Sequence, residues 1–335
     1  MKSKKVVFAA PWKVEVQDEE FDAKNLPAET AALKRIYSLI SAGTELACLS
    51  GGESWFKLPG VHGYTAISEV TAVGSDVKKF SVGDKVYHFG KHCLYSIASQ
   101  NDIVIKIPDG IEEKYVPFTR MATIAMTALR TSEIELGDYA AVTGLGLVGN
   151  FAMQLARLQG ANVIAIDPSK RRRELASACG ARHTIDPLSE NSKERVLAMT
   201  DTNGVNTFIE ASGVPKVFID NIGLVGKQGE AILLGSPRGD CIANVTDLLN
   251  MSHLWGNGCV TIKGAHEWRY PVANDQFVKH SIERNSRIVM DLIASKKLMV
   301  EPLHTHTVTP DTAAKAYEGL RNEKDTYIGV VIDWR

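Results

Sequence analysis

Short runs of alternating apolar and polar residues fill about the first third of the chain. They lie at residues 34–40, 69–73, 85–87 and 103–107. Gly, Pro and Asp turn pairs, such as Gly83-Asp84, separate them. Alternation of this kind is typical of half-buried strands, and the turn residues mark where each strand ends. The pattern predicts an all-β domain, either a small barrel or a sandwich.

From about residue 139 the pattern changes to apolar strands that alternate with helices. Six candidate strands lie at residues 139–143, 163–167, 183–185, 205–209, 230–234 and 260–263. They recur about every 20 to 30 residues, the length of a βαβ unit. In the helix after the first strand, one face carries Val148, Ala152, Leu155 and Ala156, and Gly160 follows as a cap. This part of the sequence predicts a doubly wound parallel sheet and hence an α/β fold.

The remaining chain contains a helix pattern at residues 278–297 and a last alternating segment at 327–334. A chain of 335 residues exceeds one typical domain. We expect a first domain over residues 1–118, completed by 300–335, and a dinucleotide-binding domain over 119–299.

Charge and composition favour a small-molecule partner. The 38 basic and 39 acidic residues give a net charge of −1, so nothing indicates binding to nucleic acid or to an anionic membrane. No apolar stretch reaches the roughly 18 to 20 residues that span a bilayer. The five cysteines form no C-x-x-C pair, unlike a disulfide framework or a structural zinc site. The N-terminal apolar run is too short for a signal peptide, and we expect a cytoplasmic protein.

Gly144-Leu145-Gly146-Leu147-Val148-Gly149 matches the dinucleotide fingerprint G-x-G-x-x-G. It directly follows the strand at 139–143 and opens a helix. Gly144 can make the tight turn, Gly146 lets the backbone approach a pyrophosphate, and Gly149 permits close packing of helix on strand. The N-H groups at the helix N-terminus favour phosphate.

The next strand ends at Asp167, about 20 residues later, where an acidic group binds ribose hydroxyls and repels a 2′-phosphate. We therefore expect NAD rather than NADP, although Lys170, Arg171 and Arg172 leave NADP open as an alternative. The residues expected to bind the cofactor are Gly144, Gly146, Leu147, Val148, Gly149, Asp167, Arg172, Ala211, Ser212, Gly235 and Ser236.

Several segments together resemble the medium-chain dehydrogenase/reductase superfamily. They are residues 73–77, 82–86 and 106–110, the glycine motif, and Glu210-Ala211-Ser212-Gly213. The resemblance implies a GroES-like β-barrel domain followed by a Rossmann domain, and a homodimer or homotetramer. Ser41-Ala42-Gly43-Thr44-Glu45 is similar to a subgroup that includes bacteriochlorophyllide hydroxyethyl dehydrogenases and alcohol or sugar dehydrogenases.

This sequence differs from the alcohol-oxidising members of the superfamily at the positions of their catalytic zinc ligands. Their three ligands align with Ala42, Tyr64 and Arg120, none of which can replace the expected Cys, His, and Cys or Glu. The four-cysteine structural zinc loop is missing as well. We therefore expect no zinc. A new site built from His62, His88, His92 and Cys93 is the alternative.

Without zinc, other groups must stabilise the reacting oxygen and move its proton. We expect Tyr64 to hydrogen-bond that oxygen and Arg120 to supply positive charge, while Thr44 relays the proton with His62 or Glu45. An Arg120–Glu45 ion pair that simply fills the vacated site is the other interpretation.

Aromatic residues with polar neighbours supply the candidate substrate contacts. They are Trp55, His266 and Trp268, and flat aromatic faces beside polar groups suit a polyhydroxylated ring. The segments that contain His266 and Trp268 suit a dimer interface equally well, and Trp55 suits a loop anchor.

The expected activity is a zinc-independent hydride transfer between NAD and a secondary alcohol or ketone, with a sugar or polyol as the expected substrate class. The alternatives are a zinc-free enone or quinone reductase, which commonly prefers NADPH, and a non-catalytic dinucleotide-binding protein.

Overall fold

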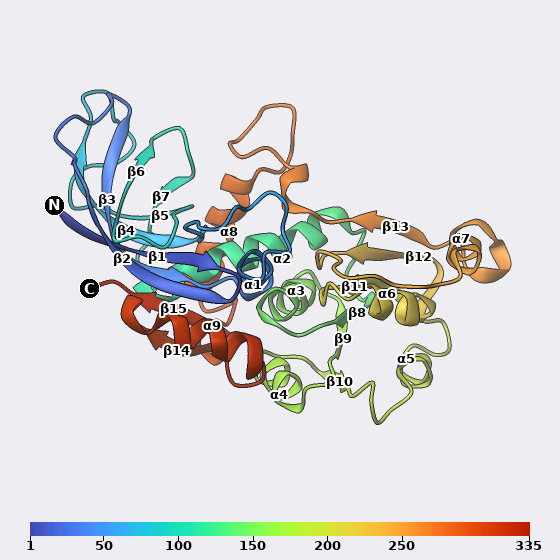
Figure 1. Cartoon of the computed structure of the whole chain (residues 1–335). Helices are drawn as coiled ribbons and strands as arrows, with labels where there is room; N and C mark the ends of the chain where they lie inside the picture. The colour runs from blue at the N-terminus through green and yellow to red at the C-terminus, as the bar shows by residue number, and fades with distance from the viewer. The chain divides into compact units, whose positions relative to one another are not determined.

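The computed structural model describes all 335 residues, and the chain divides into two compact units (Figure 1). The first unit comprises Met1–Arg120, Pro271–Lys296 and Leu303–Arg335, and the second comprises Met121–Tyr270 and Lys297–Pro302. Residues 271–296, which we expected in the dinucleotide-binding domain, thus group with the first unit.

The first unit is built on a seven-stranded sheet of order β14-β15-β3-β4-β5-β7, in which β6 also pairs with β3. Its strands are Thr30–Leu39 (β3), Ala66–Val73 (β4), Lys85–His88 (β5), Tyr95–Ser99 (β6), Val104–Lys106 (β7), His304–Val308 (β14) and Gly329–Asp333 (β15). A separate hairpin joins Lys2–Ala10 (β1) to Lys13–Glu20 (β2). The sheet strands predicted from alternation are present, whereas β1, β2, β6 and β14 were not predicted.

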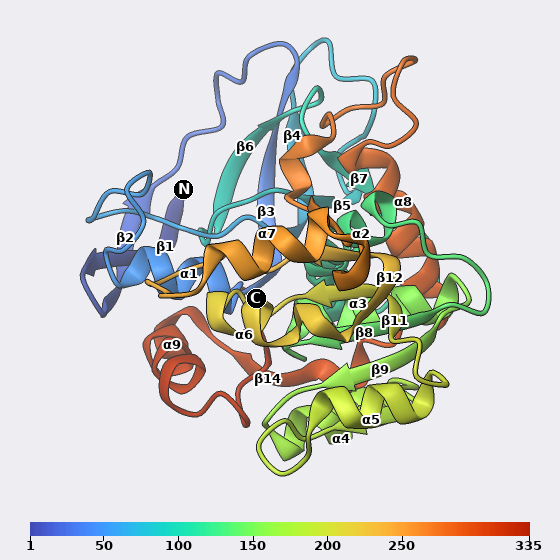
Figure 2. The same ribbon diagram turned by 90° about the vertical axis from the view of Figure 1, so that its right-hand side faces the viewer.

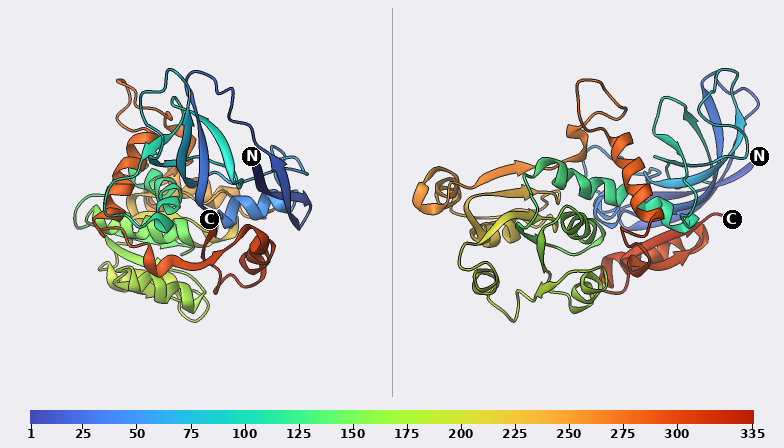
Figure 3. Two further views of the ribbon diagram at one scale, coloured as in Figure 1. Left: turned by 90° about the vertical axis from the view of Figure 1, so that its left-hand side faces the viewer. Right: turned by 180° about the vertical axis from the view of Figure 1, so that it is seen from behind.

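The C-terminal tail completes this sheet, because β15 pairs antiparallel with β3 through partners such as Val331 and Leu39. Its side chains join a core cluster that contains Phe8, Ile40 and Tyr317. In Figure 3 the C-terminal segment, drawn in red, lies beside the blue N-terminal hairpin. Residues from the two ends of the chain therefore share one core.

Helices and single turns complete the first unit. They are Ala42–Leu49 (α1), Glu113–Phe118 (η1), Ile282–Ala294 (α8), Glu301–Leu303 (η5), Pro310–Thr312 (η6) and Ala313–Asn322 (α9), with η5 lying at the boundary between the units. The pattern predicted α8 but not α1. Helix α1 is only eight residues long, and it contains Gly43 and Thr44, which favour helices weakly.

The second unit is a parallel sheet of order β10-β9-β8-β11-β12-β13 with helices between the strands (Figure 2). Its strands are Tyr139–Thr143 (β8), Asn162–Ile166 (β9), His183–Ile185 (β10), Val205–Glu210 (β11), Val225–Leu233 (β12) and Thr261–Gly264 (β13). The order reverses between β8 and β11, as in a doubly wound Rossmann sheet. The predicted α/β fold, with a Rossmann sheet and a separate β domain, is confirmed.

The helices of the second unit are Thr119–Thr131 (α2, which starts in the first unit), Leu147–Leu158 (α3), Lys170–Ala178 (α4), Ser192–Met199 (α5), Pro215–Asn221 (α6) and Val245–His253 (α7). Short turns lie at Ile222–Leu224 (η2), Trp255–Asn257 (η3) and Glu267–Arg269 (η4). A core of Ile164, Phe208 and Val260, with their neighbours, fills one side of the sheet. None of the helices has the length and apolar character needed to cross a membrane.

Candidate active site and dinucleotide site

The glycine motif lies on the carboxyl end of β8, the edge where Rossmann sheets bind ligands. Gly144 has a φ of +81°, in the left-handed region that favours glycine. Gly146 is the N-cap of α3, and Leu147, Val148 and Gly149 form the helix's first turn. The N-H groups of that turn precede the first intrahelical bond, which Asn150 donates to the Gly146 carbonyl. The motif therefore presents free donors, as an anion site requires.

The glycines of this edge approach other backbone segments too closely for any side chain. A Cβ on Gly149 would lie 1.8 Å from the Gly144 carbonyl oxygen, and one on Gly144 would lie 2.6 Å from the Ser212 nitrogen. A Cβ on Gly235 would lie 2.3 Å from the Gly213 nitrogen. The loops after β8, β11 and β12 therefore pack directly against one another. Gly146 differs, because a Cβ there would have no neighbour within 4 Å.

Asp167 follows β9 and binds the glycine loop through its carboxylate. One oxygen accepts the Leu145 N-H at 2.7 Å, and the other accepts the Ser169 N-H at 2.8 Å. The residue is only 2% exposed. Arg172, in the first turn of α4, has its Nη1 atom 3.8 Å from the same carboxylate. Backbone N-H donors thus hold the Asp167 carboxylate in place, and its negative charge lies at the end of β9.

Glu210, at the end of β11, is the first residue of the motif Glu210-Ala211-Ser212-Gly213, but we did not predict it as a site residue. Its carboxylate accepts the N-H groups of Ser212 and Gly213. Burial raises the pKa of this carboxyl, and these hydrogen bonds oppose the shift. Ala211 and Ser212 follow this strand, and Gly235 and Ser236 follow β12. The sequence signal that could have identified Glu210 as a site residue is an acidic residue at the end of a strand, directly before Ala-Ser-Gly.

Tyr64 and Arg120 lie together in the first unit. The guanidinium carbon of Arg120 is 5.5 Å from the centre of the Tyr64 ring and 4.1 Å from that of Phe89. Both distances are typical of cation–π contacts. The Tyr64 hydroxyl donates a hydrogen bond to the Ser41 Oγ. Burial raises the pKa of Tyr64, while hydrogen bonds with Ser41 and Thr44 partly offset that shift. The phenol is therefore protonated at neutral pH and can donate to a reacting oxygen.

Glu45, on α1, is fully buried and has three donors of its own. Its carboxylate accepts hydrogen bonds from the Ser41 N-H, the Tyr317 hydroxyl and His92 Nε2. Burial alone would raise the pKa of Glu45, but His92 beside its carboxylate more than offsets that effect, so the pKa is lowered. Glu45 is therefore a buried carboxylate that contacts other side chains of the fold.

His62 lies among aromatic rings, with its ring centre 5.0 Å from Phe56, 5.7 Å from Tyr64 and 5.8 Å from Trp55. The Gly63 N-H donates to its Nδ1 at 2.7 Å. A neutral His62 must therefore carry its proton on Nε2. Burial lowers the pKa of His62, which keeps the ring neutral, although Glu45 partly opposes this shift.

The family's zinc is not supported by the residues in its ligand positions. Ala42 has no donor atom, Tyr64 is a protonated phenol, and Arg120 is a permanent cation. The alternative set is divided among different hydrogen-bond networks. His88 contacts Arg35 and Ser68, whereas His92 contacts Ser38 and Glu45. No group of three His, Cys, Asp or Glu side chains in the chain is arranged to hold a metal ion.

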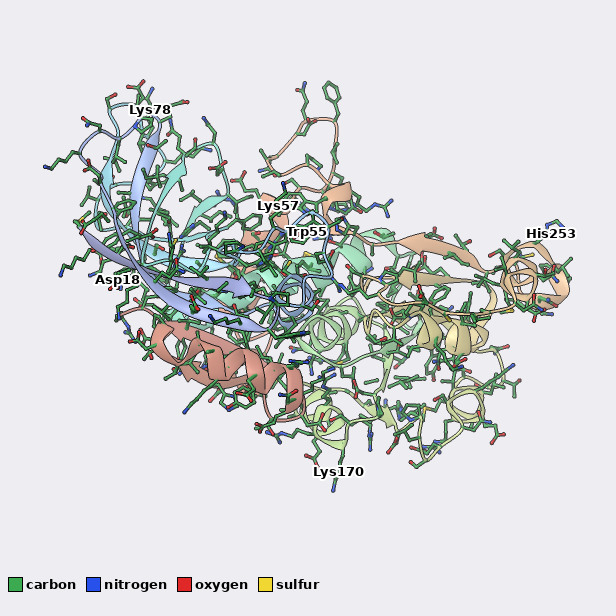
Figure 4. The ribbon with its side chains drawn as sticks, viewed as in Figure 1. Asp18, Trp55, Lys57, Lys78, Lys170 and His253 are labelled. Atoms are coloured by element: carbon green, nitrogen blue, oxygen red, sulfur yellow. The ribbon has the colours of Figure 1, made fainter.

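The three candidate substrate residues lie in different units. Trp55, labelled in Figure 4, follows α1 in the first unit and is 61% exposed. Its indole N-H donates to Glu53. His266 directly precedes η4 in the second unit, and Trp268 lies within η4 and is 57% exposed. In the first unit the structure therefore places Trp55 next to His62, which in turn lies next to Tyr64.

Comparison with known proteins identifies both halves of the chain. Residues 34–127 match the alcohol dehydrogenase GroES-like domain, and residues 148–274 match the zinc-binding dehydrogenase domain. An L-threonine 3-dehydrogenase of Pyrococcus abyssi is 27% identical over 333 residues, covering 89% of this chain and 90% of the relative. A D-guloside 3-dehydrogenase of Escherichia coli is 31% identical over 154 residues, covering 45% and 44% respectively.

Among solved structures, galactitol-1-phosphate dehydrogenase from Escherichia coli has the same fold. The match has a TM-score of 0.83 at 19% identity and covers 99% of this chain and 100% of that one. The two domain matches and the named dehydrogenase relatives show that the chain is an oxidoreductase of the NAD(P)-dependent medium-chain dehydrogenase/reductase superfamily.

Proposed function

We propose that this protein transfers a hydride between NAD and a secondary alcohol or ketone without a catalytic zinc ion. The observation that carries the proposal is the cluster of Tyr64 and Arg120, which occupy two of the three positions that align with the zinc ligands, with Ser41 hydrogen-bonded to Tyr64. A hydroxyl donor beside a fixed cation supplies the two functions that a metal would otherwise provide, which are polarisation of the oxygen and stabilisation of its charge.

The glycine loop, the α3 N-terminus and Asp167 would hold the dinucleotide, whose nicotinamide supplies or accepts the hydride when bound. In the reduction direction, Tyr64 donates its proton to the carbonyl oxygen. Arg120 stabilises the negative charge that develops on this oxygen. We keep Thr44 as a second hydroxyl beside Tyr64, and we assign His62 to orientation through its Nε2-H.

A sugar or polyol is the proposed substrate class. The exposed indole of Trp55 offers a flat apolar face for the C-H groups of a carbohydrate ring, while nearby His62 and Tyr64 can hydrogen-bond its hydroxyls. His266 and Trp268 are proposed as further contacts. The similarity to D-guloside 3-dehydrogenase agrees with this class.

The direct test is a screen of NAD and NADP reduction with polyols, sugars and sugar acids. The proposal predicts turnover of at least one polyhydroxylated substrate with NAD preferred. If the protein instead reduces only enones or quinones, and does so with a strong preference for NADPH, the competing reductase function holds.

Asp167→Ser should weaken NAD binding about 10- to 100-fold, because charge-assisted hydrogen bonds are worth about 1.5–3 kcal/mol. It should weaken NADP binding less, since the repulsion of a 2′-phosphate is removed along with the anchor. Fluorescence titration of both dinucleotides measures the change. Equal losses for the two would mean that Asp167 acts only by anchoring the loop.

Location and assembly remain proposals as well. The five cysteines are all free thiols, which suits a reducing cytoplasm. A homodimer or homotetramer, as implied by the family resemblance, would be detected by sedimentation.

A further inference from the structure

Ser41 occupies the N-cap of α1 but does not cap the helix. At this position a serine side chain normally accepts an N-H of the first turn, which stabilises a helix by about 1 kcal/mol. Here the Ser41 side chain makes no capping hydrogen bond, and its Oγ accepts the Tyr64 hydroxyl instead. The helix therefore forgoes a common stabilising contact while the serine hydroxyl is directed at Tyr64.

Glu45 fixes Ser41 in this arrangement. Its carboxylate accepts the Ser41 backbone N-H at 2.8 Å, one turn away along the chain. Ser41 is only 5% exposed and Glu45 is completely buried. The backbone of Ser41 is thus held by a group that cannot move into solvent, which leaves the hydroxyl in contact with Tyr64.

His92 and Tyr317 hold Glu45 in turn. His92 Nε2 lies 3.0 Å from the carboxylate, and the Tyr317 hydroxyl donates to it. On the other side of the ring, His92 Nδ1 lies 2.8 Å from the Ser38 Oγ, which also accepts the Trp334 indole N-H at 2.9 Å. When the Ser38 hydroxyl donates to His92 Nδ1 and the His92 Nε2-H donates to Glu45, every polar hydrogen of this network has an acceptor. Such a satisfied buried network is rigid.

We propose that Ser41 is the proton-relay partner of Tyr64, and that Glu45 and His92 are positioning residues which hold Ser41 for this role. The inference rests on the proposed function, because it requires Tyr64 to be the proton donor.

In the reduction of a ketone, the reduced dinucleotide supplies the hydride, and the protons come from Tyr64 and Ser41. The hydride adds to the carbonyl carbon, and the carbonyl π electrons move to the oxygen, which takes the Tyr64 proton. As Tyr64 turns its proton from the Ser41 Oγ to the substrate oxygen, the Ser41 hydroxyl rotates to donate to the Tyr64 oxygen, passes its proton to that oxygen and regains one from water. Oxidation of the alcohol runs the same transfers in reverse. Serine suits this position because its hydroxyl both donates and accepts.

Ser41→Ala should lower kcat about 100-fold, within the range for lost acid–base catalysis, and leave the dissociation constant of NAD unchanged. Ser41→Thr keeps the hydroxyl and should restore most of the rate. Ser68→Ala is the matched control, because Ser68 is equally buried but hydrogen-bonds Arg35 and His88. It should reduce stability without lowering kcat.

The positioning role is tested by a pH profile. Tyr64 is faced by Ser41 at the N-cap of α1, by Thr44 and Glu45 on α1, by Arg120 on α2, and by His62 on its own loop. The Glu45 charge raises the pKa of Tyr64 and Arg120 lowers it. In the direction of ketone reduction, where Tyr64 must be protonated, Glu45→Gln should therefore shift the basic limb of the kcat/KM profile to lower pH. Tyr317→Phe removes a donor but keeps the charge, so its basic limb should stay in place.

The outcomes separate this inference from the function beneath it. A fully active Ser41→Ala enzyme, in a protein whose Tyr64→Phe variant is inactive, overturns the relay alone. If Glu45→Gln lowers the melting temperature but leaves the pH profile unmoved, Glu45 is merely structural. If the Tyr64→Phe variant is fully active, the proposed function fails first.

Discussion

Tyr64→Phe is expected to lower kcat by about 100- to 10,000-fold, the range for removal of a general acid or base. The substitution removes one oxygen atom and keeps the ring that Arg120 contacts. Because the glycine loop and Asp167 are untouched, the dissociation constant of NAD should not change. Steady-state kinetics and fluorescence titration measure the two quantities separately.

Tyr95→Phe is the control for this variant. Tyr95 lies on β6 and stacks on Phe21, with 5.2 Å between the ring centres. It should retain full kcat. Full activity in the Tyr64 variant would remove Tyr64 from the chemistry, whereas equal losses in both variants would indicate a general effect of losing a hydroxyl.

Two glycines of the dinucleotide motif are expected to respond differently to alanine. In Gly149→Ala the new methyl group would lie 1.8 Å from the Gly144 carbonyl oxygen, so the loop must move. Overpacking of this kind costs about 1–3 kcal/mol or more, and both the melting temperature and NAD binding should fall.

Gly146→Ala has no such clash, because nothing lies within 4 Å of the added Cβ and the backbone of Gly146 is extended (φ −64°, ψ −172°). Its melting temperature should match the parent's. NAD affinity should nevertheless fall at least about tenfold, since the methyl group occupies the space where the pyrophosphate approaches. Unchanged affinity in this stable variant would show that the dinucleotide does not bind over Gly146.

Periodicity predicted the second unit well, because buried parallel strands form continuous apolar runs with helices of regular spacing between them. It missed β1, in which the apolar run Val6-Val7-Phe8 does not alternate with polar residues, and β2, in which only Val14 and Val16 stand among polar and charged residues. It also missed α1, which is short and carries weak helix formers. Residues 271–296 group with the first unit through tertiary contacts, which a local sequence pattern cannot predict.

The backbone geometry of the candidate site was predictable where a motif specifies it, as at the turn of Gly144 and the close packing at Gly149. The hydrogen-bond partners of individual side chains could not be predicted from the sequence. The interpretation of Glu45 as part of a proton relay did not foresee that His92 and Tyr317 surround its carboxylate. Tyr317 lies 272 residues away from Glu45 in the sequence. Ser41 entered the sequence analysis only as part of the subgroup motif, because no local pattern shows that its hydroxyl contacts Tyr64, 23 residues away.

The central claim is that catalysis proceeds through Tyr64 and Arg120 without zinc. Its most direct test is metal analysis by mass spectrometry on protein that is turning over its substrate, before and after treatment with a chelator. The account predicts full turnover with NAD in protein that contains no stoichiometric zinc, and no loss after chelation. Stoichiometric zinc whose removal abolishes turnover and whose return restores it would contradict the account.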